Sequence, residues 1–167
     1  MVIILFIIVL VIILSILKLK GKTGKQTQHT EYYPYKSNRY LLTKAEKSFY
    51  NVLKMALDEK YYICPKVRLA DILYVTDSNK KQTYFNKIVG KHIDFVICEA
   101  DSLSPIFVIE LDDSSHERQD RKNRDDFLNK ALKFAGMPIL RIKASYSYNP
   151  KHLKDEIQEI LDKRNVA

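Results

Sequence analysis

Cysteine is scarce in this 167-residue chain, which contains only Cys64 and Cys98. Neither belongs to a C-x-x-C pair, the spacing that structural zinc sites use, so the sequence argues against a structural zinc site. Both cysteines lie within apolar runs that are typical of strands. We therefore expect two reduced thiols in the core of the protein, which suits a reducing cytosol.

The first seventeen residues lack charge and contain a single polar residue, Ser15. As a helix they would span about 26 Å, at about 1.5 Å per residue, close to the roughly 30 Å of a bilayer's hydrocarbon core. A cleaved signal peptide would have basic residues before this run and an A-x-A-like cleavage site after it, and the sequence has neither. These features predict a single-pass membrane-spanning helix over residues 1–17.

Acidic residues are nearly absent from residues 18–39, where Glu31 stands against five lysines and Arg39. This segment contributes +5 of the formal net charge of +8, so most of the excess lies beside the apolar run. Basic residues flank the cytoplasmic end of a membrane helix and attract anionic lipid. We therefore predict a location in the inner (cytoplasmic) membrane, with residues 18–40 as a basic polar linker and the soluble domain in the cytoplasm.

From Leu41 the pattern becomes that of one compact domain over residues 41–167. "TKAEKSFYNVLKMALDEK" has apolar residues at helical spacing behind a capping box of Thr43 and Glu46. Three strands follow in "YYICPKVRL", "HIDFVIC" and "PIFVIEL". After them we expect a helix over 118–135, a strand in "MPILRIK" and a last helix capped by Asn149. Residues 69–91 are ambiguous between loop and short helix. This order predicts an α/β layered domain.

Three carboxylates interrupt or end these apolar strands. Glu110 and Asp112 are two residues apart and therefore point to the same side of their strand. Asp94 lies between Ile93 and Phe95. If the two strands are neighbours, the three acids converge, and like charges at close range raise each other's pKa unless a cation offsets them. Because Mg²⁺ binds one or two carboxylates together with water and phosphate oxygens, the pattern suggests a metal site.

Basic residues are expected near the same end of the sheet. Arg121 and Arg124 extend the apolar stripe of their helix towards its start, where they would face Glu110 and Asp112. Arg141 emerges from the adjacent strand "PILRIK". Arginines beside acids suit a metal site that also holds phosphate.

Each of these residues also has a purely structural interpretation. Glu46 is explained by its capping box, and His116 by an exposed loop. Arg121 and Arg124 are explained by ion pairs on a helix surface. Asp94 resists such an explanation most, because a lone acid inside an apolar strand needs a partner.

The segments "HIDFVIC", "VIELDDSSH" and "RKNRDDFLNKALKFAGMPILRI" closely resemble the bacterial domain-of-unknown-function family 2726. That family is similar to the PD-(D/E)XK nuclease superfamily, in its branch near the very-short-patch-repair endonucleases. The resemblance covers about residues 41–145 and implies a restriction-endonuclease-like αβββαβ core, followed here by a C-terminal helix. It also implies dependence on Mg²⁺ or Mn²⁺, with no small-molecule cofactor.

In that superfamily an acid lies on one strand, Glu-x-Lys lies on the next, and a further Glu often lies on the first helix. Carried over, the resemblance makes Asp94 and Glu110 the metal ligands. Asp112 takes the place of the lysine, and related branches with Asp there carry a following histidine, here His116. The resemblance thus implies a catalytic set of Glu46, Asp94, Glu110, Asp112 and His116, with phosphate bound by Arg121, Arg124 and Arg141.

The replaced lysine leaves two functions open, because an aspartate cannot supply positive charge. His116 would serve as general acid or base, and Arg121 or Arg124 would replace the lost charge. The first function is a membrane-anchored, metal-dependent nuclease that hydrolyses phosphodiester bonds of nucleic acid. The alternative is a catalytically inactive module of the same fold that binds nucleic acid or protein at the membrane. The domain charge of only +3 favours this alternative.

Overall fold

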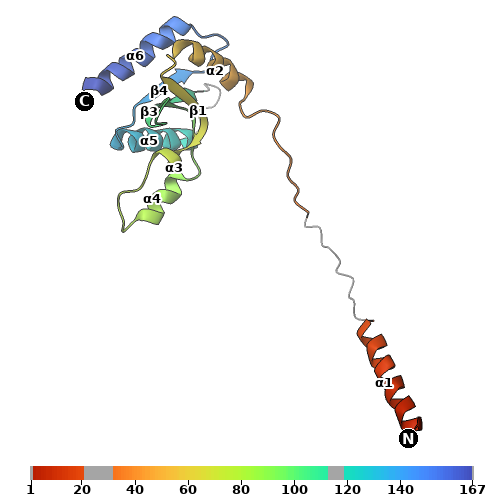
Figure 1. Cartoon of the computed structure of the whole chain (residues 1–167). Coiled ribbons are helices and arrows are strands. Elements are labelled where there is room, and N and C mark those ends of the chain that lie inside the picture. Colours follow the sequence, from red (N-terminus) through yellow and green to blue (C-terminus); the bar gives the residue numbers. More distant parts are fainter. Residues whose placement is uncertain (1, 21–31, 113–118, 167) are drawn as a thin grey trace. The chain divides into compact units, whose positions relative to one another are not determined.

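The computed structural model describes residues 2–20, 32–112 and 119–166, without the side chains of residues 19–20, 119–124 and 165–166. The chain divides into two compact units, Met1–Asn38 and Arg39–Ala167, whose elements are labelled in Figure 1. Each unit is described by itself below.

The first unit contains one helix, α1 (Val2–Lys20). Its apolar side chains are exposed on all sides, and the hydroxyl of Ser15 donates to the carbonyl of Val11 over 2.8 Å. The sequence predicts a membrane-spanning helix here. However, none of the helices in the described part of the chain is long and apolar enough to cross a membrane. The helix itself is present, but its membrane-spanning role is not supported.

The second unit is a mixed α/β domain built on a four-stranded sheet in the order β1-β2-β3-β4. Strands β1, β2 and β3 are antiparallel neighbours, and β4 lies parallel to β3. The strands are β1 (Tyr61–Arg68), β2 (His92–Glu99), β3 (Pro105–Asp112) and β4 (Ile139–Lys143). As the sequence predicts, "HIDFVIC" and "PIFVIEL" are adjacent.

Helices cover both faces of this sheet (Figure 1). α2 (Lys44–Ala56) and α6 (Pro150–Val166) pack on one face, and α5 (Gln119–Phe134) packs on the other. The ambiguous stretch between β1 and β2 forms two short helices, α3 (Leu69–Ile72) and α4 (Lys81–Ile88). The predicted order of helix, three strands, helix, strand and helix is therefore confirmed.

Local signals in the sequence begin and end the main helices. Thr43 and Glu46 form the predicted capping box at the start of α2, each side chain accepting from the other's backbone N–H. The side chain of Asn149 accepts from the N–H of Lys151 over 2.9 Å at the start of α6. Gly136, with φ of 68°, follows α5 in the left-handed conformation that commonly ends a helix.

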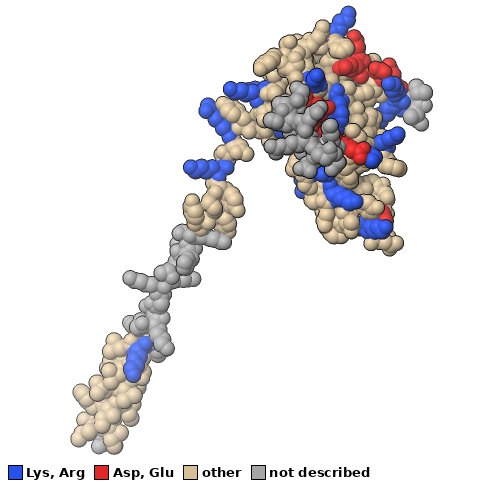
Figure 2. Space-filling view, turned by 180° about the vertical axis from the view of Figure 1, so that it is seen from behind, with Lys and Arg blue, Asp and Glu red and all other residues tan. Residues whose placement is uncertain are grey.

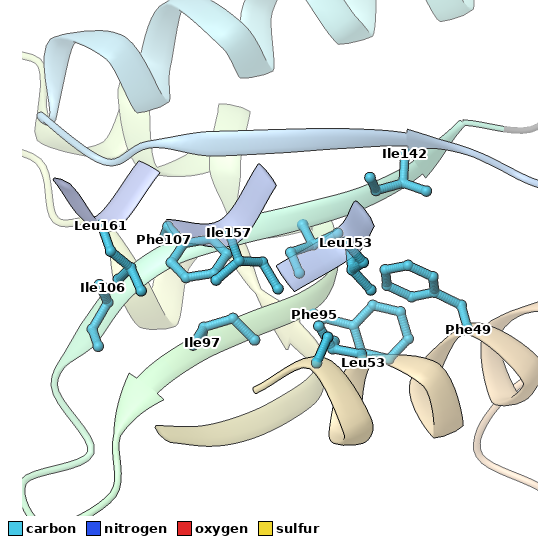
Figure 3. Packing of buried hydrophobic residues seen from close by; sticks show 12 residues of the cluster. Phe49, Leu53, Phe95, Ile97, Ile106, Phe107, Ile142, Leu153, Ile157 and Leu161 are labelled. Carbon is cyan, nitrogen blue, oxygen red and sulfur yellow. The ribbon is translucent and has the colours of Figure 1, made fainter. Parts of the chain in front are cut away.

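Two apolar clusters hold the domain together, one on each face of the sheet. Figure 3 shows the first, where Phe49 and Leu53 of α2 and Leu153 of α6 pack on Phe95 and Ile97 of the sheet. Complete burial of side chains this large contributes about 1.5–3 kcal/mol each. The second cluster lies under α5 and includes most of the apolar face of that helix.

The two cysteines behave as the sequence predicts. Both are free thiols, and Cys98 is buried in the second cluster with Cys64 packed against it. Burial, together with the neighbouring Cys64, raises the pKa of the Cys98 thiol to about 12. Cys98 therefore stays protonated at neutral pH and acts as a small apolar core residue.

Near the start of β2, the side chains stop alternating regularly between the two faces of the sheet. Ile93 belongs to the second cluster, whereas Phe95, two residues later, belongs to the first. Strand alternation would place both on one face, so the alternation breaks between them, at Asp94. Lys66, which lies opposite Asp94 in β1, has a φ of 57°. Such a conformation costs a non-glycine residue about 1–3 kcal/mol and often accompanies a functional site.

Candidate active site

The ends of four strands meet at one end of the sheet. β1 ends where β2 begins, with Arg68 paired to His92. Because β3 is antiparallel to β2 and parallel to β4, its last residue Asp112 lies at this end too, paired with Lys143. The predicted acids of β2 and β3 are therefore brought to the same end of the sheet.

Lys66 links two of the predicted acids. Its ammonium contacts the carboxylate of Glu46 on α2 at 2.5 Å and that of Asp94 on β2 at 3.4 Å. The side chains are only partly accessible, at 13% for Glu46, 19% for Asp94 and 32% for Lys66. One cation thus stands between two carboxylates that would otherwise repel each other in a half-buried position.

The pKa values of this group follow from those contacts. Burial by itself raises the pKa of Glu46, but hydrogen bonds from Lys66 and Thr43 outweigh it, and the pKa falls below 4.5. Burial by itself lowers the pKa of Lys66, but Glu46 and Asp94 outweigh it, and the pKa rises above 10.5. Glu46 and Lys66 are therefore both charged at neutral pH.

Asp94 is also bonded to the neighbouring strand. Its second carboxylate oxygen accepts from the backbone N–H of Leu111 in β3 over 3.0 Å. At this end of the sheet, Phe95 and Ile109 are the last residues of β2 and β3 that pair with each other. The Asp94 side chain thus occupies the opening between the strands and lies against the backbone next to Glu110.

A second polar group surrounds Arg141 on β4. Its guanidinium donates to Asp112 over 2.6 Å and to the side-chain oxygen of Asn129 over 3.1 and 3.2 Å. Asp125 lies further off, at 3.8 Å. Arg141 therefore joins β4, the end of β3 and α5, and its charge is largely balanced by Asp112.

The remaining predicted site residues are located less completely. Glu110 is half-buried in β3, in register with Arg141. Arg121 and Arg124 belong to the first turns of α5, and their side chains lie outside the described part of the structure. His116 also lies outside the described residues. Among the residues that are described, no group of three His, Cys, Asp or Glu is placed to hold a metal ion.

Sequence reasoning missed Lys66 and Asn129. Lys66 was detectable in principle, because it is the one charged residue within "YYICPKV", an otherwise apolar strand. A lone charge in such a strand needs a partner, and this holds for Lys66 as much as for Asp94. Asn129 carries no comparable signal, because a polar residue on a helix is ordinary.

Residues 38–160 match the family described as "Protein of unknown function (DUF2726)". The chain belongs to this family. The match runs from before α2 into α6, so it includes Glu46, Lys66, Asp94, Glu110 and Arg141. The predicted resemblance to this family is confirmed, and the wider similarity to PD-(D/E)XK nucleases stays a prediction. No curated protein and no solved structure matches the chain.

Proposed function

We propose that the Arg39–Ala167 domain is a metal-dependent nuclease that hydrolyses phosphodiester bonds of nucleic acid. The observation that carries the proposal is the half-buried ammonium of Lys66 between Glu46 and Asp94, beside the end of β3. Acids from different elements and a fixed positive charge are the groups that phosphoryl transfer needs. The order of helices and strands also agrees with the αβββαβ core that the resemblance implies.

Asp94 and Glu110 are the two carboxylates proposed to hold the implied metal. Mg²⁺ is often held by one or two carboxylates, with water and substrate phosphate completing its coordination, so a cluster of three acids is not required. Asp94 lies against the β3 backbone beside Glu110, and these two residues would hold Mg²⁺ or Mn²⁺. A bound metal would lower the pKa of its water and offset charge that develops on the phosphate.

The other residues would act around this pair. Lys66 supplies the positive charge that Asp112 cannot, and Glu46 holds Lys66 in place. Arg121, Arg124 and Arg141 are proposed to bind phosphate, and Asp112 orients Arg141 through their ion pair. His116 is proposed to move protons. Its replacement should lower the rate by about 10²–10⁴-fold, the usual scale of general acid–base catalysis.

Cleavage of single- and double-stranded DNA and RNA by the full chain, at low salt with Mg²⁺ or Mn²⁺, tests the proposal. Asp94→Ala and Glu110→Ala should each remove most of the activity. Asp101→Ala is the matched control, because Asp101 is an exposed acid in the loop between β2 and β3. Cleavage that persists in both site variants would come from a contaminant and would refute the assignment.

A catalytically inactive module that binds nucleic acid or protein is the second candidate. The ion pair between Asp112 and Arg141 favours it, because each residue already neutralises the other. The same assay separates the two functions. Wild-type protein that never cleaves, but binds nucleic acid with a steep dependence on salt, would identify the binding module.

We also propose that the first unit associates with lipid at the inner membrane. The apolar side chains of α1 are exposed, and the lysines from Lys18 to Lys25 would attract anionic headgroups. This association would bring the domain to the membrane surface without contributing to its chemistry.

A further inference from the structure

The entry segment, residues 32–44, runs into the start of α2 and carries exposed aromatic rings. Its first ten residues read "YYPYKSNRYL" and contain four tyrosines and a leucine. All ten are exposed, with 85% of Tyr32, 82% of Tyr35 and 70% of Leu41 accessible. Single exposed apolar residues are ordinary on a protein surface, but a cluster of them marks a site of interaction. The entry segment is therefore a candidate surface for a partner.

A tight turn at Pro34 places two of these rings side by side. The backbone N–H of Tyr35 donates to the carbonyl of Tyr33 over 2.9 Å, which closes a three-residue turn. Proline suits the centre of this turn, because its ring fixes φ at roughly −65°, close to the roughly −75° of the inverse form. The rings of Tyr33 and Tyr35 stack, with centroids 6.4 Å apart and planes at 25°. Contacts within three residues thus gather two rings into one small patch.

Basic residues without an acid accompany these rings. The entry segment contains Lys36, Arg39 and Lys44 and no aspartate or glutamate. Figure 2 shows blue but no red side chains between the grey residues and the domain. Among the described residues, no carboxylate forms an ion pair with any of these three side chains. The guanidinium of Arg39 lies over the ring of Tyr40 instead, 5.2 Å from its centroid.

We infer that the entry segment lies on a membrane surface containing anionic lipid, with its tyrosines at the level of the headgroups and its basic side chains beside lipid phosphates. Tyrosine is enriched at membrane interfaces because its ring is apolar and its hydroxyl stays hydrated. Each lysine or arginine near an anionic surface adds attraction. The inference rests on the proposed association of α1 with lipid and extends it to a second segment. Attraction by three charges is weak and reversible, so the entry segment orients a chain that α1 already holds.

A membrane suits the entry segment better than a nucleic acid or a protein groove does. The chain before it contains the exposed apolar side chains of α1 and the lysines from Lys18 to Lys25. A surface of anionic lipid takes up the apolar helix, the basic residues and the tyrosines together. A nucleic acid would use the rings and the charges but would leave the apolar side chains of α1 in water. An apolar protein groove would leave the charges unused.

Contact at the entry segment would decide where the domain lies. α2 begins at Lys44, three residues after Leu41, so the start of the domain would be held within about 10 Å of the surface. If α1 alone held the chain, residues 21–43 would form a tether of up to about 80 Å at full extension. The inference therefore predicts a domain held at the membrane surface instead of one at the end of a long tether.

Tryptophan fluorescence tests the inference, because the chain contains no tryptophan of its own. Tyr35→Trp in the full chain reports on the entry segment, and Tyr146→Trp, at a fully exposed ring of the domain, is the matched control. With vesicles of equal parts phosphatidylcholine and phosphatidylglycerol, the emission of Tyr35→Trp should shift to shorter wavelength and should be quenched by lipid brominated on its acyl chains. The emission of Tyr146→Trp should do neither. Tyr32→Trp repeats the measurement outside the turn at Pro34.

The basic residues provide a second measurement. In the Tyr35→Trp chain, Lys36→Gln and Arg39→Gln should each lower the ratio of lipid-bound to free entry segment about fivefold, the scale of one charge near an anionic surface. Lys151→Gln, at an exposed lysine of α6, should leave this ratio unchanged. High salt should return the Tyr35→Trp emission to its value in buffer, while the chain, held by α1, still sediments with the vesicles.

The results that would overturn the inference are distinct from one another. If the chain sediments with vesicles but the emission of Tyr35→Trp and Tyr32→Trp stays as in buffer, α1 alone meets the lipid. If the chain does not sediment with vesicles at all, the lipid association of α1 fails together with this inference. If the emission of Tyr35→Trp shifts with a dT20 strand or with rising protein concentration, but not with vesicles, the entry segment binds nucleic acid or a second copy.

Discussion

The carboxylate of Asp94 accepts a 3.0 Å hydrogen bond from the backbone N–H of Leu111, so a side chain of β2 replaces a ladder bond to β3. The bond holds the acid in the opening between the two strands, beside Glu110. Asp94 also contacts Lys66 through its other oxygen. A lone acid inside an apolar strand thus has two partners, and neither is its neighbour in sequence.

Asp94 has a structural role and a proposed chemical role that two substitutions should separate. Asp94→Asn keeps an oxygen that accepts from Leu111, so its free energy of unfolding should stay within about 1 kcal/mol of the wild type. Asp94→Ala leaves that N–H without its partner and should lose about 1–3 kcal/mol. Both should lose cleavage, since neither carries the charge. Urea unfolding and the nuclease assay measure the two effects, and an active Asp94→Asn would contradict the metal-binding role.

Lys66 and Glu46 should make the free energy of unfolding depend on pH, Glu46 in the acid range and Lys66 in the alkaline range. The pKa of Glu46 is lowered from 4.5, so its contribution is fully present above that pH and is lost as the pH falls through the folded-state pKa. The pKa of Lys66 is raised from 10.5, so its contribution is present below that pH and is lost as the pH rises through the folded-state pKa.

The variant Lys66→Met tests this window, because it leaves the two carboxylates without their shared cation. The difference in unfolding free energy between wild type and Lys66→Met should be largest at neutral pH and should shrink in acid below 4.5. Lys163→Met is the control, since its pair with Glu159 is exposed on α6 and should contribute little at any pH. A difference that stays constant from pH 3 to pH 8 would show that the ion pair does not stabilise the fold.

Arg141 should stabilise the contact of β4 with β3 and α5. Arg141→Gln removes the charged contact with Asp112 and should lower the free energy of unfolding by about 1 kcal/mol. Arg141→Lys should fall between wild type and Arg141→Gln, because a lysine cannot reach Asp112 and Asn129 with one planar group. Lys154→Gln, which breaks the single exposed pair with Asp58, is the matched control for urea unfolding. Equal effects of Lys154→Gln and Arg141→Gln would mean that the group around Arg141 is not a stabilising unit.

Lipid association is tested by fractionation. The full chain should sediment with membranes and stay there in high salt, because the apolar side chains of α1 are buried on binding. A chain lacking residues 1–20 should remain in the supernatant. Release of the full chain by salt alone would show that the lysines hold it by charge and that α1 does not enter the lipid.

The sequence by itself determined the elements of the domain and their order. Apolar spacing, the Thr43–Glu46 capping box and Asn149 mark helices through contacts within a few residues, and such local contacts can be read directly from the chain. The same holds for β2 and β3, whose apolar runs predict buried neighbouring strands. Asp94, Glu110 and Asp112 were found because each interrupts or ends such a run, whereas Glu46 was found through the family resemblance.

Only the tertiary structure decided what stands beside those acids. Lys66 lies 20 residues from Glu46 and 28 from Asp94 in sequence, and Arg141 lies 29 from Asp112. These contacts follow from strand register, from the break in alternation at Asp94 and from the positive φ of Lys66. Side-chain spacing along one strand carries no information on its partner strand. The cation beside Glu46 and Asp94 therefore comes from a third element, strand β1, whose position is set by packing of the whole sheet.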